Sequence, residues 1–408
     1  MMPGGPLGGD RVAQRWPWCA QALVLWFVPL PLPLLLIRIS MAILVPLLLL
    51  SAGMRQAQAQ NSPSAAVMAP VASQPMGAGS GASRKAWATS AALSRGINLT
   101  VYAAPREGDW GLRMDDQWID TLAQAGFRSV RLSVRWSNHA AASPDALLDE
   151  AFARRIDRVV DALLARDLRV VMNMSFYSQL SGWPLDEGEA PVAARVVRTR
   201  FINIWRQLAR RHAHRSDRLV FELYNAPQGP PQQWNSLAAA ALAGIRQSNP
   251  VRIVVIAPLR NEASHLADLS LPRDPHLVVA IHNREPRTFT NQGLPWFAGS
   301  DKWLGTHCCD EAQRLSLERN LDLAKAWSDA HRYPLWLGSF GAASTAPMES
   351  RARYLRLMRE AAEARGMAWA HADFAANFNV RDPPLDSGIY DVVKRQWHRP
   401  LLDALLGP

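Results

Sequence analysis

From residue 93 onward, short hydrophobic runs alternate with longer segments whose hydrophobic positions repeat with helical periodicity. The short runs are rich in Val and Ile and almost continuously apolar, as in a parallel sheet covered on both faces. They lie at residues 96–101, 129–134, 169–176, 219–225, 252–257, 276–282, 334–340 and 367–374. The clearest helical patterns lie at 115–125, 149–166, 193–212, 318–331 and 349–365. Eight alternating units predict an α/β fold, a single (β/α)8 TIM barrel over residues 93–408.

A doubly wound parallel sheet is the alternative fold for this alternation. Such sheets carry a glycine-rich phosphate loop after the first strand, and no such loop follows residues 96–101. A TIM barrel needs about 250 residues, which the segment 93–408 supplies. The pattern therefore favours the barrel, preceded by an apolar leader and a disordered linker.

The first 59 residues have the composition of an export signal. Two arginines precede an uncharged apolar run at 16–37, and residues 57–59 read Ala-Gln-Ala, an A-x-A cleavage pattern. We expect residues 1–59 to be a signal peptide or an uncleaved membrane anchor, because the run is long enough to span a bilayer. Residues 60–92, rich in Ala, Ser, Gly and Pro, are predicted to be a disordered linker. The barrel is then periplasmic or extracellular, and it contacts a membrane only through an uncleaved leader.

The net charge of +10 is carried almost entirely by arginine. Such a composition is typical of a GC-rich coding sequence, and the functional alternative is affinity for anionic polymers or membrane surfaces. No basic segment is interleaved with aromatic residues, and no nucleic-acid-binding motif is present, so no nucleic-acid partner is expected.

Three cysteines do not make a disulfide framework. Cys19 lies in the leader, and Cys308 and Cys309 are adjacent, where two thiols are favoured over a vicinal disulfide. His307 and Asp310 flank the pair, but four consecutive side chains cannot surround a metal ion tetrahedrally without another element. No metal and no other cofactor is therefore expected.

Two predicted strands end in motifs that resemble one glycosidase family. Residues 221–227 read Phe-Glu-Leu-Tyr-Asn-Ala-Pro, and residues 334–342 read Pro-Leu-Trp-Leu-Gly-Ser-Phe-Gly-Ala. Both resemble glycoside hydrolase family 5, the cellulase-like clan, in which the first motif ends Asn-Glu-Pro and the second reads Gly-Glu-Phe-Gly. Supporting motifs lie at 95–99, 129–136 and 279–293, so the resemblance spans residues 93–395. It implies a TIM-barrel glycosidase that acts on polysaccharide.

The two catalytic glutamates that the resemblance implies are replaced. The family's acid/base position is Ala226, and its nucleophile position is Ser339. Retaining hydrolysis needs two carboxyl groups about 5 Å apart, and neither residue supplies one. Asp373 is the best candidate for a relocated acid. Glu222 lies on the same strand face as Ala226 but about 13 Å deeper, at about 3.3 Å per residue.

Other site positions are partly kept. The resemblance implies that Arg131 holds the nucleophile, that Asn225 bonds the sugar 2-hydroxyl and that His282 lines the site. The family's strand-three His, strand-six Tyr and strand-eight Trp are replaced by Ser175, Arg284 and Ala372.

Further candidate sugar contacts are the aromatic residues Trp136, Tyr177 and Trp296. With sixteen tryptophans in the chain, core or rim packing is the alternative role for such residues. Arg131 also has an alternative, a structural ion pair with Glu222 inside the barrel.

These residues together predict a pseudo-glycosidase, an exported barrel that binds polysaccharide or oligosaccharide without retaining hydrolysis. Two alternatives stay open. One is an active O-glycosyl hydrolase that uses Asp373, and the other is a structural or assembly subunit of an exopolysaccharide system. Because Arg284 adds a positive charge beside Arg131, anionic glycans are among the candidate ligands.

Overall fold

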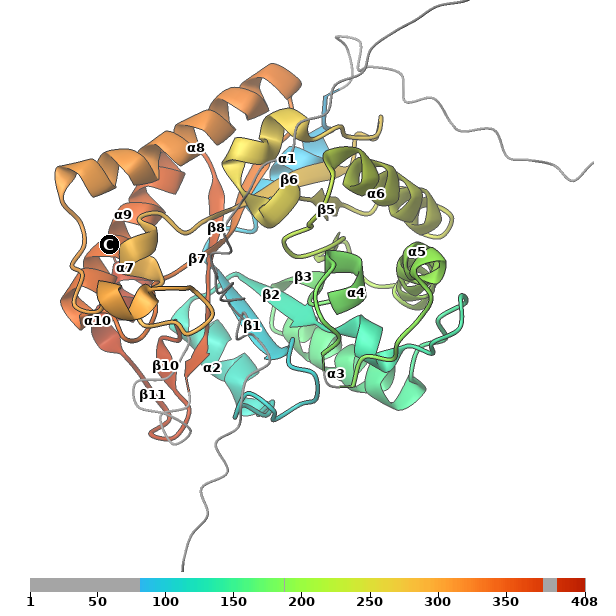
Figure 1. Cartoon of the computed structure of the whole chain (residues 1–408), viewed down its shortest axis with the longest axis horizontal. Helices are drawn as coiled ribbons and strands as arrows, with labels where there is room; N and C mark the ends of the chain where they lie inside the picture. The colour runs from blue at the N-terminus through green and yellow to red at the C-terminus, as the bar shows by residue number, and fades with distance from the viewer. Residues whose placement is uncertain (1–80, 187, 377–386, 408) are drawn as a thin grey trace, which may run out of the picture. The chain divides into compact units, whose positions relative to one another are not determined.

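The computed structural model describes residues 81–186, 188–376 and 387–407 (Figure 1). All described residues belong to one compact unit, Met76–Pro408. The expected leader (1–59) and most of the expected linker (60–80) lie outside the described residues. Among the helices of the described residues, none is long and apolar enough to cross a bilayer.

Eight parallel strands close into a barrel in chain order, with β1 paired to both β2 and β8. The strands are β1 (Gly96–Tyr102), β2 (Ser129–Val134), β3 (Arg169–Met174), β4 (Leu219–Glu222), β5 (Val254–Ile256), β6 (Leu277–Asn283), β7 (Leu335–Phe340) and β8 (Ala368–His371). The predicted (β/α)8 barrel is thereby confirmed. The strand runs were recognisable because almost every strand residue is buried, as the pattern of β2 illustrates.

Helices surround the strands (Figure 1). The longer ones are α2 (Gln117–Ala125), α3 (Glu150–Ala165), α5 (Ala194–Arg211), α6 (Pro231–Arg246), α8 (Glu311–His331), α9 (Met348–Ala364) and α10 (Arg399–Leu406). Short turns and helices between them are η1 (Trp136–His139), α4 (Ser178–Ser181), η2 (Leu259–Asn261), η3 (Ala263–Asp268), α7 (Arg287–Thr290) and η4 (Ser300–Trp303). Helix α8 begins earlier than expected because Asp310 and Gln313 form a capping box at its N-terminus.

Alternate strand residues build two separate cores. Val171, Val220 and Val255 belong to a hydrophobic cluster inside the barrel, whereas their strand neighbours belong to the larger cluster between strands and helices. The registers Val171↔Val220 and Val255↔Val278 place interior residues of adjacent strands side by side. The barrel is therefore filled with side chains, and a ligand site has room only at its ends.

The first described helix, α1 (Arg84–Ala91), corrects the predicted linker. Ser83 caps it by accepting from the Ala86 amide at 3.2 Å, and Ser90 Oγ donates to the Leu335 carbonyl at 2.8 Å. Ala86 is fully buried in the interior cluster. The helix covers the N-terminal mouth of the barrel, so the linker does not extend to residue 92. Its Ala- and Ser-rich composition concealed it.

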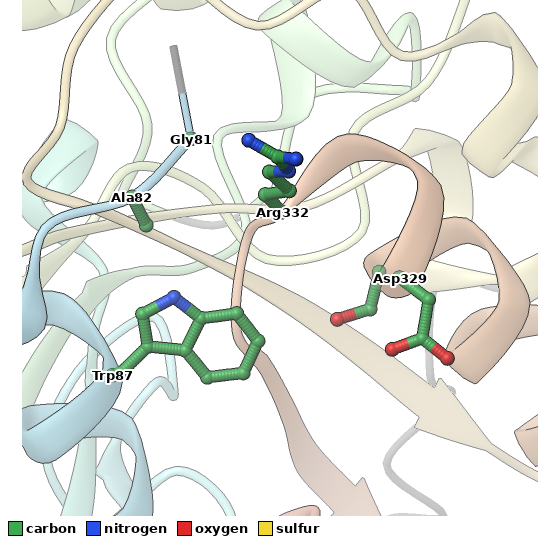
Figure 2. A pocket seen from close by; sticks show the side chains of 6 residues that line it. Gly81, Ala82, Trp87, Asp329 and Arg332 are labelled. Atoms are coloured by element: carbon green, nitrogen blue, oxygen red, sulfur yellow. The ribbon is translucent and has the colours of Figure 1, made fainter. Parts of the chain in front are cut away.

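A hollow of about 460 Å³ lies beside this helix (Figure 2). Its lining includes Trp87 of α1 together with Asp329 and Arg332 at the end of α8. Because α1 sits at the N-terminal mouth, this hollow lies at the opposite end of the barrel from the C-terminal ends of the strands, where barrel enzymes bind substrate.

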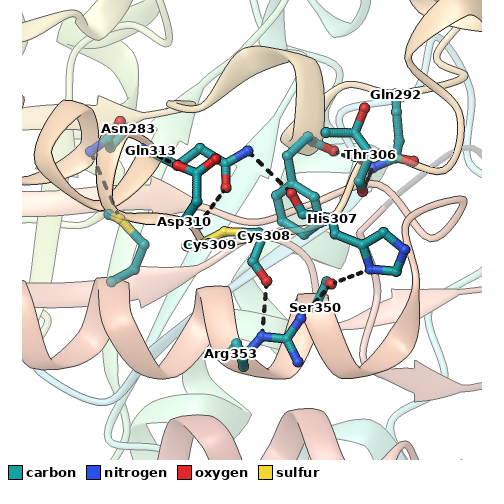
Figure 3. The surroundings of a disulfide bond; sticks show 12 residues. Asn283, Gln292, Thr306, His307, Cys308, Cys309, Asp310, Gln313, Ser350 and Arg353 are labelled. Carbon is teal, nitrogen blue, oxygen red and sulfur yellow. Dashed lines mark hydrogen bonds between the residues drawn. A yellow bond between two sulfur atoms is a disulfide. The ribbon is translucent and has the colours of Figure 1, made fainter.

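Cys308 and Cys309 form a vicinal disulfide, which corrects the expectation of two thiols (Figure 3). The pair precedes α8, and Arg353 of α9 donates from Nε to the Cys308 carbonyl at 2.9 Å. Sequence adjacency alone did not reveal the bond, because it depends on the local backbone conformation. After β8, the short strands β9 (Ala375–Ala376), β10 (Tyr390–Asp391) and β11 (Gln396–Trp397) form a small sheet.

Candidate functional site at the barrel mouth

The sequence-predicted positions gather at the C-terminal ends of the strands. Ser339 lies in β7 opposite His282 of β6, and Ala226 follows the end of β4. Ala226 has a φ of 53°, a left-handed conformation that is uncommon outside glycine. Its amide donates to Asn261 Oδ1 at 2.7 Å. The two positions that the resemblance assigns to catalytic carboxylates therefore belong to the same end of the barrel.

Arg131 is the most completely bonded polar side chain of the site. Its Nε and NH2 donate to the two carboxylate oxygens of Glu222 at 2.6 and 2.7 Å. NH1 donates to Asn98 Oδ1 at 2.9 Å, and NH2 donates to Asn225 Oδ1 at 3.0 Å. Arg131 is 3% exposed and Glu222 is fully buried. Of the two roles considered for Arg131, the structure therefore shows the structural ion pair, in which Arg131 and Glu222 neutralise each other inside the barrel.

His282 is a neutral ring at this mouth. Burial holds its pKa well below its usual value, and the charges of Arg131 and Arg284 lower that pKa further. Asn261 Nδ2 lies 2.8 Å from Nε2 of the ring, so the amide donates to an unprotonated nitrogen. Asn261 thereby links His282 to the Ala226 amide. Sequence reasoning missed Asn261, which lies in η2 after β5 and belongs to no motif.

Ser339 and Arg284 form a second polar pair. Arg284 NH2 donates to Ser339 Oγ at 2.9 Å, and Ser339 is only 2% exposed. Burial lowers the pKa of Arg284 from its usual value, whereas the negative charge of Asp373 acts in the opposite direction. A guanidinium therefore lies against the position that the resemblance assigns to the nucleophile.

Asp373 follows the end of β8 and is partly exposed. Its negative charge acts on Arg284, so it lies in the same region of the mouth. It brings one carboxyl group to the site, and Glu222 uses both of its oxygens on Arg131. Glycoside hydrolysis uses two cooperating carboxyl groups, and neither Ala226 nor Ser339 carries one.

Two predicted sugar contacts are corrected. Trp136 is fully buried and packs edge-on against Phe152 of α3, with ring centroids 5.6 Å apart. Tyr177 is also fully buried, and its hydroxyl accepts from Arg200 NH1 at 2.6 Å. Both side chains point into the packing between strands and helices, so neither presents a ring to a ligand. Trp296, in contrast, is 41% exposed in the loop between α7 and η4.

An aromatic cluster at the mouth was missed by the sequence reasoning. Trp110, in the loop after β1, packs edge-on against Phe176 at the end of β3, with centroids 5.6 Å apart. The Arg135 guanidinium lies 4.9 Å from the Phe176 ring, and Trp183 lies 6.4 Å from the same ring. Trp110, Phe176 and Trp183 are partly exposed. The available signal was aromatic residues in the segments that follow strands one and three.

The described residues contain no group of three His, Cys, Asp or Glu side chains arranged to hold a metal ion. His307, beside the disulfide, instead lies 3.2 Å from Ser350 Oγ through its Nδ1. The polar groups at the mouth include amides, hydroxyls, the neutral ring of His282, the carboxyl group of Asp373 and two guanidinium groups. Such a set can orient a ligand by hydrogen bonds.

Comparison with known proteins agrees with this geometry. Endoglucanase H of Acetivibrio thermocellus is 30% identical over 323 residues, which are 78% of this chain and 33% of that protein. Cellodextrinase A of Ruminococcus flavefaciens is 28% identical over 184 residues, which are 44% of this chain and 53% of that protein. This chain therefore spans a third to about half the length of these relatives.

Solved structures extend the comparison to the fold. Cel5A of Thermotoga maritima in complex with cellobiose superposes with a TM-score of 0.72 at 32% identity, covering 79% of this chain and 100% of that one. The cellulose synthase subunit Z of Clostridioides difficile gives a TM-score of 0.69 at 29% identity, covering 77% and 99%. The family model for cellulase (glycosyl hydrolase family 5) matches residues 89–377. With most of its length matched and its barrel in place, this chain belongs to glycosyl hydrolase family 5, the cellulase family.

Proposed function

We propose that this member of the family binds polysaccharide at the barrel mouth without retaining hydrolysis. The observation that carries the proposal is the pair of side chains at the two catalytic positions, Ala226 and Ser339. An alanine has no proton to donate to a leaving group. Ser339 Oγ accepts from Arg284, and within the described segments no hydrogen bond joins this hydroxyl to a general base. General acid catalysis alone contributes roughly 10²–10⁴-fold in rate, so this loss is large.

The nearby acids do not restore the missing pair. Glu222 is fully buried and held by Arg131 through both oxygens. Asp373 lies close enough for its charge to act on Arg284, and neither Ala226 nor Ser339 supplies it with a second carboxyl group. The alternative function is a glycoside hydrolase that uses Asp373 as its relocated acid. Such an enzyme needs a second carboxyl group as nucleophile or base.

Polysaccharide binding is supported by what the mouth retains. Asn225, His282 and the partly exposed rings of Trp110, Phe176 and Trp183 face the end of the barrel where family relatives hold sugars. The Thermotoga relative is described in complexes with cellobiose and with mannotriose. β-1,4-linked glucan and mannan are therefore the first ligand classes for this chain.

The proposed location follows from the leader. An apolar run at 16–37 and the A-x-A pattern at 57–59 support export to the periplasm or the cell exterior. Membrane attachment, if the leader stays uncleaved, is through this segment alone. The similarity to a cellulose synthase subunit supports a second candidate role, in which the barrel serves an exopolysaccharide system as a glycan-holding subunit.

The test is a paired measurement of turnover and binding on the purified protein. Reducing ends released from β-1,4-glucan and mannan report hydrolysis, and calorimetry with the matching oligosaccharides reports binding. We expect binding without turnover. Turnover in the ordinary enzyme range of about 1–10³ s⁻¹ overturns the proposal. Its loss in Asp373→Asn, but not in the exposed control Asp329→Asn on α8, then identifies the relocated acid.

A further inference from the structure

The two guanidinium groups at the barrel mouth are neutralised very differently. Arg131 meets both oxygens of Glu222 and two further side-chain oxygens. Arg284 has one acceptor for its guanidinium among the described side chains, the neutral Ser339 hydroxyl. A guanidinium carries five N–H donors, so most of those on Arg284 have no acceptor within residues 81–186, 188–376 and 387–407.

No nearby residue of the described segments cancels the charge of Arg284 by direct contact. No ion pair joins Arg284 to a carboxylate there, although the charge of Asp373 acts on it through space. His282 cannot contribute, because a neutral ring carries no charge and its pKa is lowered. A guanidinium is protonated at every physiological pH. A partly buried cation that lacks a direct ion pair is costly in free energy, and an anionic ligand would lower that cost.

The donors are arranged to receive such an anion. Ser339 Oγ accepts from Arg284 and keeps its own O–H to donate. Arg284 NH2 and Ser339 Oγ are 2.9 Å apart, so an anion bound by one side chain is also close to the other. A planar guanidinium fork matches a planar carboxylate better than a single hydroxyl, as Arg131 and Glu222 demonstrate in the same barrel.

We propose that Arg284 and Ser339 bind the carboxylate of an acidic sugar residue, so that this barrel prefers uronate-containing glycans to neutral ones. The inference rests on the proposed glycan-binding function and names its ligand class. Relative to the family pattern, position 339 has lost a negative charge and position 284 has gained a positive one. In the family pattern, a carboxylate of the protein faces a neutral sugar. After this double change, a cation of the protein faces the sugar, and it favours a sugar that carries a carboxylate.

The test compares two oligosaccharides of the same linkage, cellotetraose and its C6-oxidised counterpart, tetraglucuronate. Isothermal titration at low and high NaCl gives both affinities. A charged hydrogen bond is worth roughly 1.5–3 kcal/mol, so tetraglucuronate should bind about 10- to 100-fold more tightly at low salt. High salt should reduce this preference. Sodium acetate as a competitor separates a sugar-borne carboxylate from binding of any small anion.

Matched variants locate the effect. Arg284→Gln should weaken tetraglucuronate binding about tenfold more than cellotetraose binding, and Arg284→Lys should retain part of the preference. Arg319→Gln, an exposed arginine on α8, removes the same charge and should change neither affinity. If Arg284→Gln does not fold, Ser339→Ala replaces it, with an expected loss of affinity that is severalfold larger for tetraglucuronate than for cellotetraose.

The outcomes separate this inference from the proposed function. Equal affinities of the two tetrasaccharides, or equal losses for both in Arg284→Gln, overturn the carboxylate site and leave glycan binding intact. Displacement of tetraglucuronate by millimolar acetate also overturns it, because the site then selects small anions. Failure of both tetrasaccharides to bind overturns both proposals. Turnover of cellotetraose overturns the non-hydrolytic function, and the affinity ratio still decides the ligand class.

Discussion

Glu222 holds Arg131 through two hydrogen bonds of 2.6 and 2.7 Å inside the barrel, where neither side chain is exposed by more than a few per cent. Family resemblance assigns Arg131 to a nucleophile at position 339, and that position now holds a serine. Because Glu222 neutralises Arg131 from deeper in the barrel, the arginine remains a structural residue after the nucleophile is lost. The buried ion pair that supports the site is therefore preserved although the catalytic carboxylate is lost.

The first prediction concerns this pair. Glu222→Gln removes the carboxylate and leaves the buried Arg131 charge uncompensated, which should lower the free energy of unfolding by about 3–5 kcal/mol. Urea denaturation measures the change. Asp322→Asn breaks an exposed pair with Arg365 and should shift the midpoint very little. An unchanged midpoint in Glu222→Gln would show that another group neutralises Arg131.

The double variant Arg131→Met/Glu222→Leu separates charge from packing. It removes both buried charges and keeps the volume approximately constant, so it should recover most of the stability that Glu222→Gln loses. A double variant as unstable as the single one would assign the loss to packing inside the barrel instead.

The fold was predictable because each strand and helix of the barrel leaves a recognisable local pattern of hydrophobic residues in the sequence. β2 and β7 are buried along their whole length, and apolar residues make up half or more of each strand. The motifs at the strand ends then place Ala226 and Ser339 at one mouth. Helix α1 was not predictable, because Ala86 and Ser90 belong to an Ala/Ser-rich stretch whose burial depends on the barrel end that it covers.

Side-chain direction was the other limit. Trp136 and Tyr177 lie at strand ends, as sugar-binding rings do, but both are buried in the packing between strands and helices. Their direction is set by distant partners, Phe152 of α3 and Arg200 of α5, which a local pattern does not reveal. Asn261 was missed for the same reason, since its role comes from its position between Ala226 and His282.

The second prediction is a loss of stability in mild acid. Burial, reinforced by Arg215, lowers the pKa of His212 to about 3, and burial with Arg351 lowers that of His371 to about 3. An unfolded histidine titrates near 6.5. As pH falls from about 6.5 toward 3, the unfolded chain therefore takes up protons that the native state excludes. Each ring should remove about 1.4 kcal/mol of stability per pH unit.

Urea unfolding at pH 7, 6 and 5 measures this slope. His212→Gln should be less stable at pH 7, because a buried ring is lost, and its stability should fall less steeply with acid than that of the wild type. The slope is the diagnostic quantity, since a general packing defect would lower stability equally at each pH. Parallel curves for the variant and the wild type would contradict the assignment.

The third prediction concerns the exposed tryptophan that follows β6. If Trp296 stacks on a sugar ring, Trp296→Ala should weaken oligosaccharide binding at least about fivefold. Its 41% exposure means that the melting temperature should hardly change. Trp87→Ala is the matched control, because Trp87 is 45% exposed at the opposite end of the barrel (Figure 2). Equal effects of the two variants on binding would remove Trp296 from the site.

The fourth prediction is that hydrolysis can be restored only when Arg284 is also replaced. In Ala226→Glu/Ser339→Glu, the new carboxylate at position 339 meets the guanidinium that lies 2.9 Å from Ser339 Oγ, and an ion pair blocks its attack on a sugar. Adding Arg284→Tyr returns the residue that the family pattern places there. The triple variant should therefore release reducing ends from β-1,4-glucan at least about tenfold faster than the double variant, because the charged hydrogen bond that it removes is worth roughly 1.5–3 kcal/mol. The isosteric control Ala226→Gln/Ser339→Gln/Arg284→Tyr should stay inactive. A folded triple variant no faster than this control would mean that the barrel mouth has lost more of its catalytic geometry than its two carboxylates.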